Sequence, residues 1–279
     1  MARTPIIDHH LHLDPEGGRG IDAVKAFARS GGTHLMIVNK PSWNRGIRPE
    51  TGGDFRPVFD HTIDIVKRAS AHLDGTAWPI VGVHPGLISH LVDDQGMEPK
   101  AAADVMQAGL DAAAAFVSDG DALGLKSGRP HYDVSDAVWT ASNDVMRHAF
   151  ELATDLDCPV QLHAEGDDDL SDITAMAADA GLPRERVVKH YASGDLEGPI
   201  PSVMCRKEWL ERAAEREVPF LMETDFIDDP DRPGAVMGPQ TVPRRVRWLE
   251  EEGYQEAIRT AHVDTPKLVY DVDTEATLE

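Results

Sequence analysis

The feature that most restricts the fold of this chain is a regular alternation of short apolar runs with longer amphipathic stretches. Apolar runs that alternate with helical stretches predict βαβ units and a parallel sheet. Seven or eight such strands in about 250 residues match a closed (β/α)8 barrel. The apolar runs occupy residues 5–8, 33–38, 78–83, 121–125, 158–162, 186–189 and 218–223.

We therefore predict an α/β protein with the TIM (β/α)8 barrel fold and a single barrel domain over residues 1–279. A chain of 279 residues that is 41% hydrophobic can bury one large core. One βαβ unit is short, because the segment between the run at 186–189 and the next candidate strand at 200–205 leaves little room for a helix. The barrel is expected to be distorted there, with a reduced helix after its sixth strand.

The net charge of −22 limits the partners of the protein. Acidic residues outnumber basic ones by 49 to 27 and are spread along the whole chain. This pattern is typical of the solvated surface of a halophilic protein, with an unusually acidic mesophilic enzyme as the alternative. Nucleic-acid binding depends on neutralising phosphates, so nucleic acid is expected only as a substrate.

The sequence also predicts a cytoplasmic protein that does not enter a membrane. No apolar run approaches the length of a membrane span, and the N-terminal residues do not resemble a signal peptide. The two cysteines, Cys158 and Cys205, lie far apart, as expected for buried thiols in a reducing compartment. The oligomeric state is left open.

Ionisable side chains crowd the segment PIIDHHLHLD, residues 5–14. Because a strand places alternate side chains on one face, Asp8, His10 and His12 are expected to face one way and His9 the other. A buried strand rarely ends in His-x-His unless something binds both imidazoles. The segment therefore predicts a core strand whose far end holds a metal.

Further candidate ligands stand where other apolar runs end. The active site of a (β/α)8 barrel lies at the C-terminal ends of its strands, so these side chains are expected to meet at one rim. Imidazole and carboxylate groups are ligands that zinc favours. The candidates at these strand ends are His84, Lys126, His163, His190 and Asp225.

Five motifs occur in an order that resembles the TatD family of metal-dependent hydrolases, which belongs to the amidohydrolase superfamily of TIM-barrel enzymes: DHHLHLD, VGVHPG, PVQLHAEG, KHYASG and METDFIDDP. The resemblance covers nearly the whole chain. It implies that His10 and His12 hold one metal with Asp225, while His163 and His190 hold a second. The implied cofactor is one or two divalent ions, with zinc expected first and magnesium or manganese as alternatives.

The chain departs from this family where its fourth strand ends. TatD relatives usually carry a glutamate there that bridges two metals, whereas this chain has Leu125 and Lys126. A protonated lysine cannot ligate a metal, but the phosphotriesterase branch of the superfamily converts a lysine at this strand end to a bridging carbamate. Burial beside cations would depress the pKa of the amine and allow this reaction. We expect Lys126 to bridge; the alternatives are a contact to substrate phosphate in a one-metal site and a salt bridge to an acid.

The remaining strand-end residues receive roles from this chemistry. Asp225 is expected to take the proton of a metal-activated water and pass it to the leaving group. His84 is expected to polarise the scissile group, or only to brace its turn. Glu223 is expected to orient a ligand histidine, or to form a buried salt bridge that closes the barrel. Glu165, two residues after His163, stands where TatD relatives often have arginine.

Substrate recognition is expected from two loops. The loop at 39–57 is locally cationic and carries Trp43 and Phe55, and the segment at 127–132 adds further polar side chains. Arginine binds phosphate or carboxylate in bidentate fashion, and aromatic rings stack on bases. The alternative is that these cations pair with the acidic surface. The residues expected to contact substrate are Lys40, Arg129, His131 and Glu165.

Three functions follow from these observations. The first is a metal-dependent hydrolase of phosphoester bonds, similar to TatD relatives and including the nucleases among them. The second is a lactonase, amidase or phosphotriester hydrolase with a carboxylated Lys126. The third is a metal-binding protein without turnover.

Overall fold

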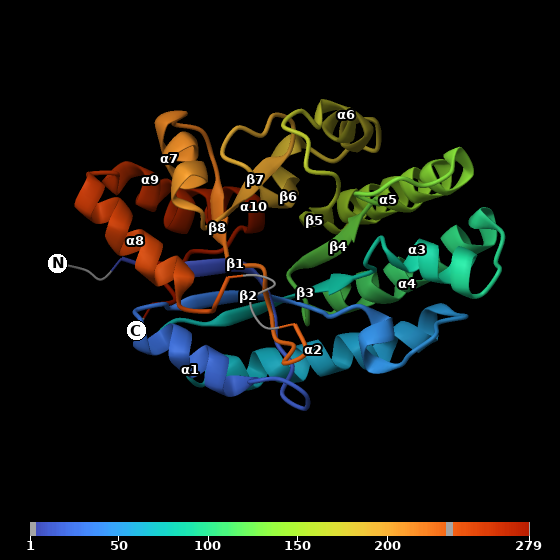
Figure 1. Cartoon of the computed structure of the whole chain (residues 1–279), viewed down its shortest axis with the longest axis horizontal. Helices are drawn as coiled ribbons and strands as arrows, with labels where there is room; N and C mark the ends of the chain where they lie inside the picture. The colour runs from blue at the N-terminus through green and yellow to red at the C-terminus, as the bar shows by residue number, and fades with distance from the viewer. Residues whose placement is uncertain (1–3, 233–236, 279) are drawn as a thin grey trace.

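The computed structural model describes residues 4–232 and 237–278, and its strands form one parallel sheet in the order β8-β7-β6-β5-β4-β3-β2-β1-β9 (Figure 1). From β8 to β1, neighbouring strands in this order follow one another along the chain, as βαβ units require, and β9 lies beside β1. The strands are β1 (Ile7–His12), β2 (His34–Val38), β3 (Ala77–Gly82), β4 (Gly124–Gly128), β5 (Val160–His163), β6 (Val187–Ala192), β7 (Ile200–Met204), β8 (Leu221–Glu223) and β9 (Phe226–Ile227).

The last strand closes the sheet because it is interrupted at Thr224 and Asp225. Its first part, β8, pairs with β7, and its second part, β9, pairs with β1 through Leu11 and Phe226. The curled parallel sheet confirms the predicted α/β barrel of TIM type. The interruption leaves Asp225 at the rim where the strands end.

Helices cover the outside of the sheet between successive strands (Figure 1). Residues 193–199, which join β6 to β7, contain no helix, so the expected reduction after the sixth strand is confirmed. The α-helices are α1 (Ile21–Arg29), α2 (Arg56–Ser70), α3 (Leu87–Ser89), α4 (Pro99–Ser118), α5 (Asp136–Leu156), α6 (Ser171–Asp179), α7 (Lys207–Glu215), α8 (Thr241–Glu252), α9 (Gln255–Arg259) and α10 (Thr265–Tyr270). Short 3-10 or π turns are η1 (Ser42–Arg45), η2 (Gly52–Phe55), η3 (His90–Asp94), η4 (Arg184–Arg186) and η5 (Thr260–Asp264).

The apolar core has an outer and an inner part. The largest cluster, which includes Phe59, Leu125 and Phe150, packs strands against α2, α4 and α5. A second cluster takes residues from six strands around the barrel, so its members face the barrel axis. Tyr270 of α10 belongs to this inner cluster, which places the end of the chain's last helix against the barrel interior.

Two strands carry one extra residue near their predicted metal ligands. In β1, the register moves from Asp8↔Leu35 to Leu11↔Ile37, so three steps match two on β2. In β6, the register moves from Lys189 to Ala192 while β7 advances by two residues. Such β-bulges re-aim side chains and break strict alternation. The assumption that Asp8, His10 and His12 simply alternate therefore does not hold across β1.

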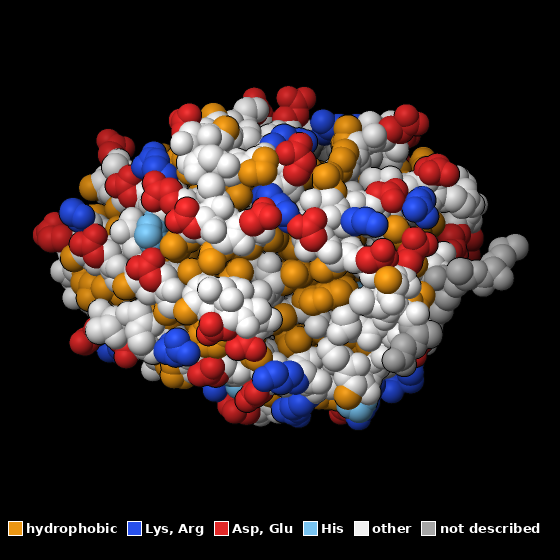
Figure 2. Space-filling view, turned by 180° about the vertical axis from the view of Figure 1, so that it is seen from behind, with side chains coloured by type: hydrophobic (Ala, Val, Ile, Leu, Met, Phe, Trp, Pro, Cys, Tyr) orange, Lys and Arg blue, Asp and Glu red, His pale blue; other side chains and the backbone are white. Residues whose placement is uncertain are grey.

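Charge is distributed evenly over the face seen from behind. Figure 2 shows acidic side chains scattered over that face with basic ones among them. Within residues 4–232 and 237–278, no helix has both the length and the apolar character that crossing a membrane would require.

We expect Gly82→Ala to destabilise the barrel, because a Cβ at Gly82 would lie 2.0 Å from the backbone oxygen of Lys126 on β4. Overpacking of this kind costs about 1–3 kcal/mol. Gly53→Ala is the control, since its Cβ would meet only Thr51 Oγ1 at 3.7 Å. Urea unfolding of both variants measures the difference, and equal stabilities would contradict the close approach of β3 and β4.

Candidate metal centre

A cavity of about 570 Å³ opens at the C-terminal ends of the strands, the rim where barrel enzymes bind substrate. Its wall is made of strand-end and loop side chains, and ionisable groups stand there beside apolar ones such as Trp43 and Ile227. The residues that line it include His12, Lys40, Trp43, His84, Lys126, His131, His163, Lys189, His190, Tyr191, Asp225 and Arg232.

Three side chains converge between the end of β1 and the break in the last strand. The Nε2 atoms of His10 and His12 lie 3.3 Å apart, and each lies 3.9 Å from Oδ1 of Asp225. The Nδ1–H of His12 donates to the carbonyl oxygen of Val38 at 2.9 Å. Burial lowers the pKa of His12 to about 4, so the ring is neutral and its Nε2 presents a lone pair.

A glutamine that the sequence analysis missed orients His10 in the same way. The amide nitrogen of Gln161 donates to the His9 carbonyl at 3.2 Å and to the Tyr270 hydroxyl at 2.8 Å. Its Oε1 is therefore left to accept from Nδ1–H of His10 at 2.8 Å. Burial holds the pKa of His10 well below its ordinary value, so its Nε2 also presents a lone pair. Two lone pairs 3.3 Å apart repel each other unless a cation lies between them.

A second histidine pair lies beside the first. Nδ1 of His163 is 2.8 Å from Nε2 of His190, and Nε2 of His163 is 2.8 Å from Nδ1 of His131. On the far side, Nδ1 of His190 lies 3.5 Å from Oε1 of Glu223, which accepts the backbone N–H of Tyr191 at 2.7 Å. Glu223 thus lies where it can orient His190, and burial raises the pKa of its carboxyl well above the usual range.

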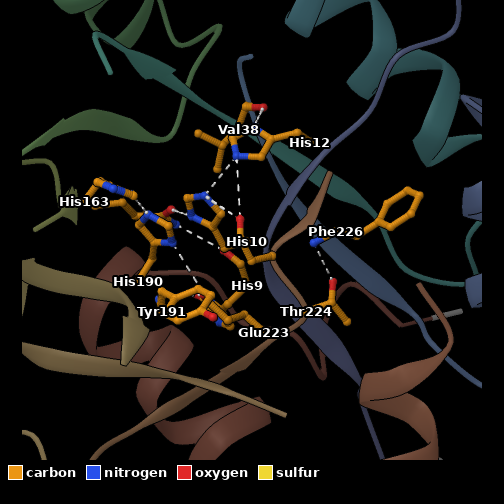
Figure 3. A network of polar contacts seen from close by, with 12 residues as sticks. His9, His10, His12, Val38, His163, His190, Tyr191, Glu223, Thr224 and Phe226 are labelled. Atoms are coloured by element: carbon orange, nitrogen blue, oxygen red, sulfur yellow. Dashed lines mark hydrogen bonds and ion pairs between the residues drawn. The ribbon is translucent and has the colours of Figure 1, made fainter. Parts of the chain in front are cut away.

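The two pairs form one cluster because His10 and His190 stack. Their ring centroids are 3.9 Å apart and their planes differ by 5°. Figure 3 shows the imidazoles of both pairs gathered at one place. One potential ligand atom each from His10, His190 and Asp225 lies within 4.8 Å of the others. The bulges in β1 and β6 fall at these stacked histidines.

Asp225 is held in a strained conformation by neighbouring groups. Its φ of 47° is in the left-handed region, which is costly for residues other than glycine. Its N–H donates to the His10 carbonyl at 3.0 Å. The carboxylate of Asp8 accepts the N–H of Thr224 at 3.0 Å and its hydroxyl at 2.6 Å. Asp8, whose pKa burial raises to about 7, therefore shapes the turn that carries the candidate ligand.

Lys126 lies in the same cluster without a hydrogen-bond partner. Its side chain is 2% exposed, and no described residue accepts a hydrogen bond from its Nζ. Burial lowers the pKa of the amine to about 7, although the carboxylates of Glu223 and Asp225 oppose the shift. An amine with this pKa is partly neutral at physiological pH.

The donor set fits a divalent cation. Neutral imidazoles and a carboxylate are the ligands that zinc binds in catalytic sites, and the hydrogen bonds on the far nitrogens of His10 and His12 are the orienting contacts usual for metal-bound histidine. Several buried polar atoms, among them Nδ1 of His190 and Oε2 of Glu223, also have no hydrogen-bond partner among the described residues. The arrangement can hold a cation at His10, His12 and Asp225, with His163 and His190 beside it.

His84 presents a hydrogen-bond donor to this cluster. The backbone N–H of Gly86 donates to its Nδ1 at 3.0 Å, so the proton of the neutral ring is on Nε2. Its ring centroid lies 4.7 Å from that of His163. The predicted polarising role therefore has a suitable tautomer.

The four residues expected to contact substrate fall into two groups. Lys40 and His131 line the cavity. Arg129 and Glu165 are not among the described residues that line it, because they pair with each other: Nε of Arg129 donates to both Glu165 oxygens at 2.9 Å. Arg129 is 3% exposed and also donates from Nη1 to Asp172 at 2.6 Å. This buried pair joins the end of β4 to the loop after β5.

Lys189 is a further cavity residue that sequence reasoning missed. It is buried, and its Nζ donates to the His190 carbonyl at 2.5 Å. Burial lowers its pKa to about 8. In the sequence, only its position directly before His190 could have indicated that Lys189 lies at the site. The position of Gln161, two residues before His163 in an otherwise apolar run, gave a similar indication.

Comparisons with known proteins agree on the family. The model of the family described as TatD related DNase matches residues 7–269. An uncharacterised protein of Methanocaldococcus jannaschii is 33% identical over 287 residues, covering 99% of each chain. A TatD homologue from Escherichia coli superposes with a TM-score of 0.63 at 16% identity, covering 96% of this chain and 98% of that one. A lactonase from Listeria monocytogenes gives 0.61 at 11% identity, with coverages of 96% and 95%. At these identities the two solved structures establish a shared fold.

We expect Gln161→Leu to weaken metal binding by about 10- to 100-fold, the usual effect of removing a group that orients a ligand histidine. Without the acceptor, the His10 proton can move to Nε2 and block the ligand atom. Gln107→Leu is the control, because that amide donates to a backbone oxygen on α5, outside the cluster. Competition with a chelating dye measures the affinities, and an unchanged value in Gln161→Leu would contradict the assigned tautomer.

Proposed function

The chain belongs to the TatD-related DNase family, and from this premise we propose that it is a metal-dependent hydrolase that cleaves phosphoester bonds. The observation that supports the proposal most is the convergence of His10, His12 and Asp225, whose ligand atoms lie 3.3–3.9 Å apart. Hydrogen bonds on the opposite sides of both imidazoles leave their lone pairs directed at this point.

The residues of the chain divide the chemistry between them. His10, His12 and Asp225 would hold a divalent ion, which when bound would lower the pKa of a coordinated water towards ~7. Asp225 is the base that takes the proton of this water and returns it to the leaving oxygen. The Nε2–H of His84 donates a hydrogen bond to an oxygen of the scissile group.

The charge of the cavity favours an anionic substrate. Lys40, Lys189 and Arg232 line it, whereas Asp225 is its one acidic lining residue among those described. Lys40 is partly neutralised by Asp14, 3.0 Å from its Nζ. In a chain with a net charge of −22, a cavity with this excess of cations selects phosphate over a neutral ester or lactone.

A lactonase or phosphotriester hydrolase is the second candidate, and it is favoured by Lys126. The neutral amine of Lys126 can attack carbon dioxide; an N–C bond forms, one proton leaves, and the product is a carbamate anion. Such an anion would replace the acid that is missing at the end of β4 and bridge two ions. The similarity in fold to a lactonase is compatible with this candidate.

We expect metal-loaded protein to hydrolyse bis(p-nitrophenyl) phosphate and not a simple lactone. Asp225→Asn should lower kcat by about 100-fold or more, because the base is lost. Asp119→Asn, an exposed acid at the end of α4, is the control. Lactone turnover without phosphoester turnover would favour the second candidate. Bound metal with neither activity would show a metal-binding protein without turnover and refute the proposal.

The role of Lys126 is tested by metal content and mass. If it bridges as a carbamate, native mass spectrometry finds one added carbon dioxide, and Lys126→Glu keeps two metals per chain while Lys126→Ala loses one. If Lys126 instead binds substrate phosphate, the mass gain is absent and Lys126→Glu raises KM without changing the metal content.

A further inference from the structure

A second cavity of about 320 Å³ adjoins the metal-centre cavity, and Trp43 lines both. A row of rings runs from the metal centre to this shared wall. The His84 centroid is 4.7 Å from that of His163 and 5.5 Å from that of Trp43, and Trp43 is 4.5 Å from His90 on the far side. A ligand that extends beyond the metal centre along this row enters the second cavity.

The second cavity combines an apolar wall with polar groups at its edge. Ile47, Pro49 and Leu87 supply the apolar side chains. The one acid that lines it among the described residues, Asp94, is already paired, with Oδ2 2.7 Å from Nδ1 of His90. The cation Arg48 is exposed and lines the same cavity.

Arg48 differs from the other cations of the loop at 39–57. Across the described part of the chain, its guanidinium has no ion pair, hydrogen bond or ring contact, although acids outnumber basic residues by 49 to 27. The other three are engaged: Lys40 with Asp14 at 3.0 Å, Arg45 with Glu16 at 3.9 Å, and Arg56 over the ring of Phe116 at 4.9 Å.

The local backbone is arranged to bring Trp43 and His84 together. A Cβ at Gly86 would lie 3.1 Å from Nδ1 of His84 and 3.6 Å from Cη2 of Trp43, so this position accommodates a side chain only if its neighbours shift. The opposite wall includes η3, a π-helical turn that begins at His90. Such turns occur frequently at functional sites.

We propose that this second cavity binds the neighbouring unit of an extended substrate, namely a planar ring against Trp43 that carries a phosphate-type oxyanion bound by Arg48, as in a nucleotide. An aromatic wall stacks on such a ring, the apolar residues exclude water from it, and a free guanidinium binds phosphate in bidentate fashion. The inference rests on the proposed function, because the metal-centre cavity is taken to hold the scissile phosphoester.

The test is calorimetric binding of adenosine 3′,5′-bisphosphate and of inorganic phosphate to metal-loaded protein. The bisphosphate can place one phosphate at the metal centre, the ring at Trp43 and the second phosphate at Arg48. We expect it to bind at least about tenfold tighter than phosphate. Arg48→Ala should weaken bisphosphate binding by about tenfold and leave phosphate binding unchanged. Trp43→Leu should also weaken bisphosphate binding by about tenfold.

Arg147→Ala is the matched control, since it also removes one exposed arginine charge but lies on α5, where Arg147 pairs with Asp144. The inference is overturned if the bisphosphate binds no tighter than phosphate, or if Arg48→Ala behaves as Arg147→Ala does. Should Trp43→Leu fail to fold, the exposed Arg48 still decides the outcome. Because binding needs no turnover, a failure to hydrolyse bis(p-nitrophenyl) phosphate would refute the proposed function separately.

Discussion

The metal-centre geometry depends on two imidazole lone pairs that hydrogen bonds hold against each other. The Val38 carbonyl holds the proton of His12 on Nδ1, and Gln161 does the same for His10. Their Nε2 atoms therefore lie 3.3 Å apart without a proton between them. In the absence of a cation this contact is repulsive, and its unfavourable energy must be offset by the packing of the rest of the barrel. The same contact, with the carboxylate of Asp225 3.9 Å from both nitrogens, would favour a cation bound at this point. The repulsion between the two nitrogen lone pairs is therefore both the source of local strain and the reason that a cation would be favoured there.

The barrel sustains this arrangement through departures from regular strand geometry. Bulges in β1 and β6 accompany the stacking of His10 on His190, and the break between β8 and β9 puts Asp225 in a left-handed conformation. Each departure is costly alone and is stabilised by contacts from elsewhere, such as the bonds from Asp8 to Thr224. The apolar inner cluster and α10 provide the rigid support, and Tyr270 connects that support to the ligands through Gln161.

Charge is organised differently at the metal centre and on the rest of the molecule. The acidic residues that dominate the composition are dispersed, while Lys40, Lys189 and Arg232 line the metal-centre cavity and Arg48 lines the second cavity. Arg129 and Glu165 neutralise each other, since Nε of Arg129 donates to both carboxylate oxygens of Glu165. Arg48, by contrast, has no ion pair among the described residues. The same chain thus combines a strongly acidic overall composition with cationic side chains at the two cavities.

The sequence by itself determined the barrel, the thin unit after the sixth strand and the candidate ligands at the strand ends, because those properties depend on periodicity and on position along a strand. The His-x-His motif at the end of an apolar run pointed to His10 and His12, and the departure from the family pattern pointed to Lys126. Only the tertiary structure decided which groups touch. Gln161 meets His10 across 151 positions, Asp8 meets Thr224 across 216, and Arg129 meets Glu165 across 36. Such contacts depend on strand register and on single-residue bulges, and one extra residue in β1 is enough to defeat any argument from alternation.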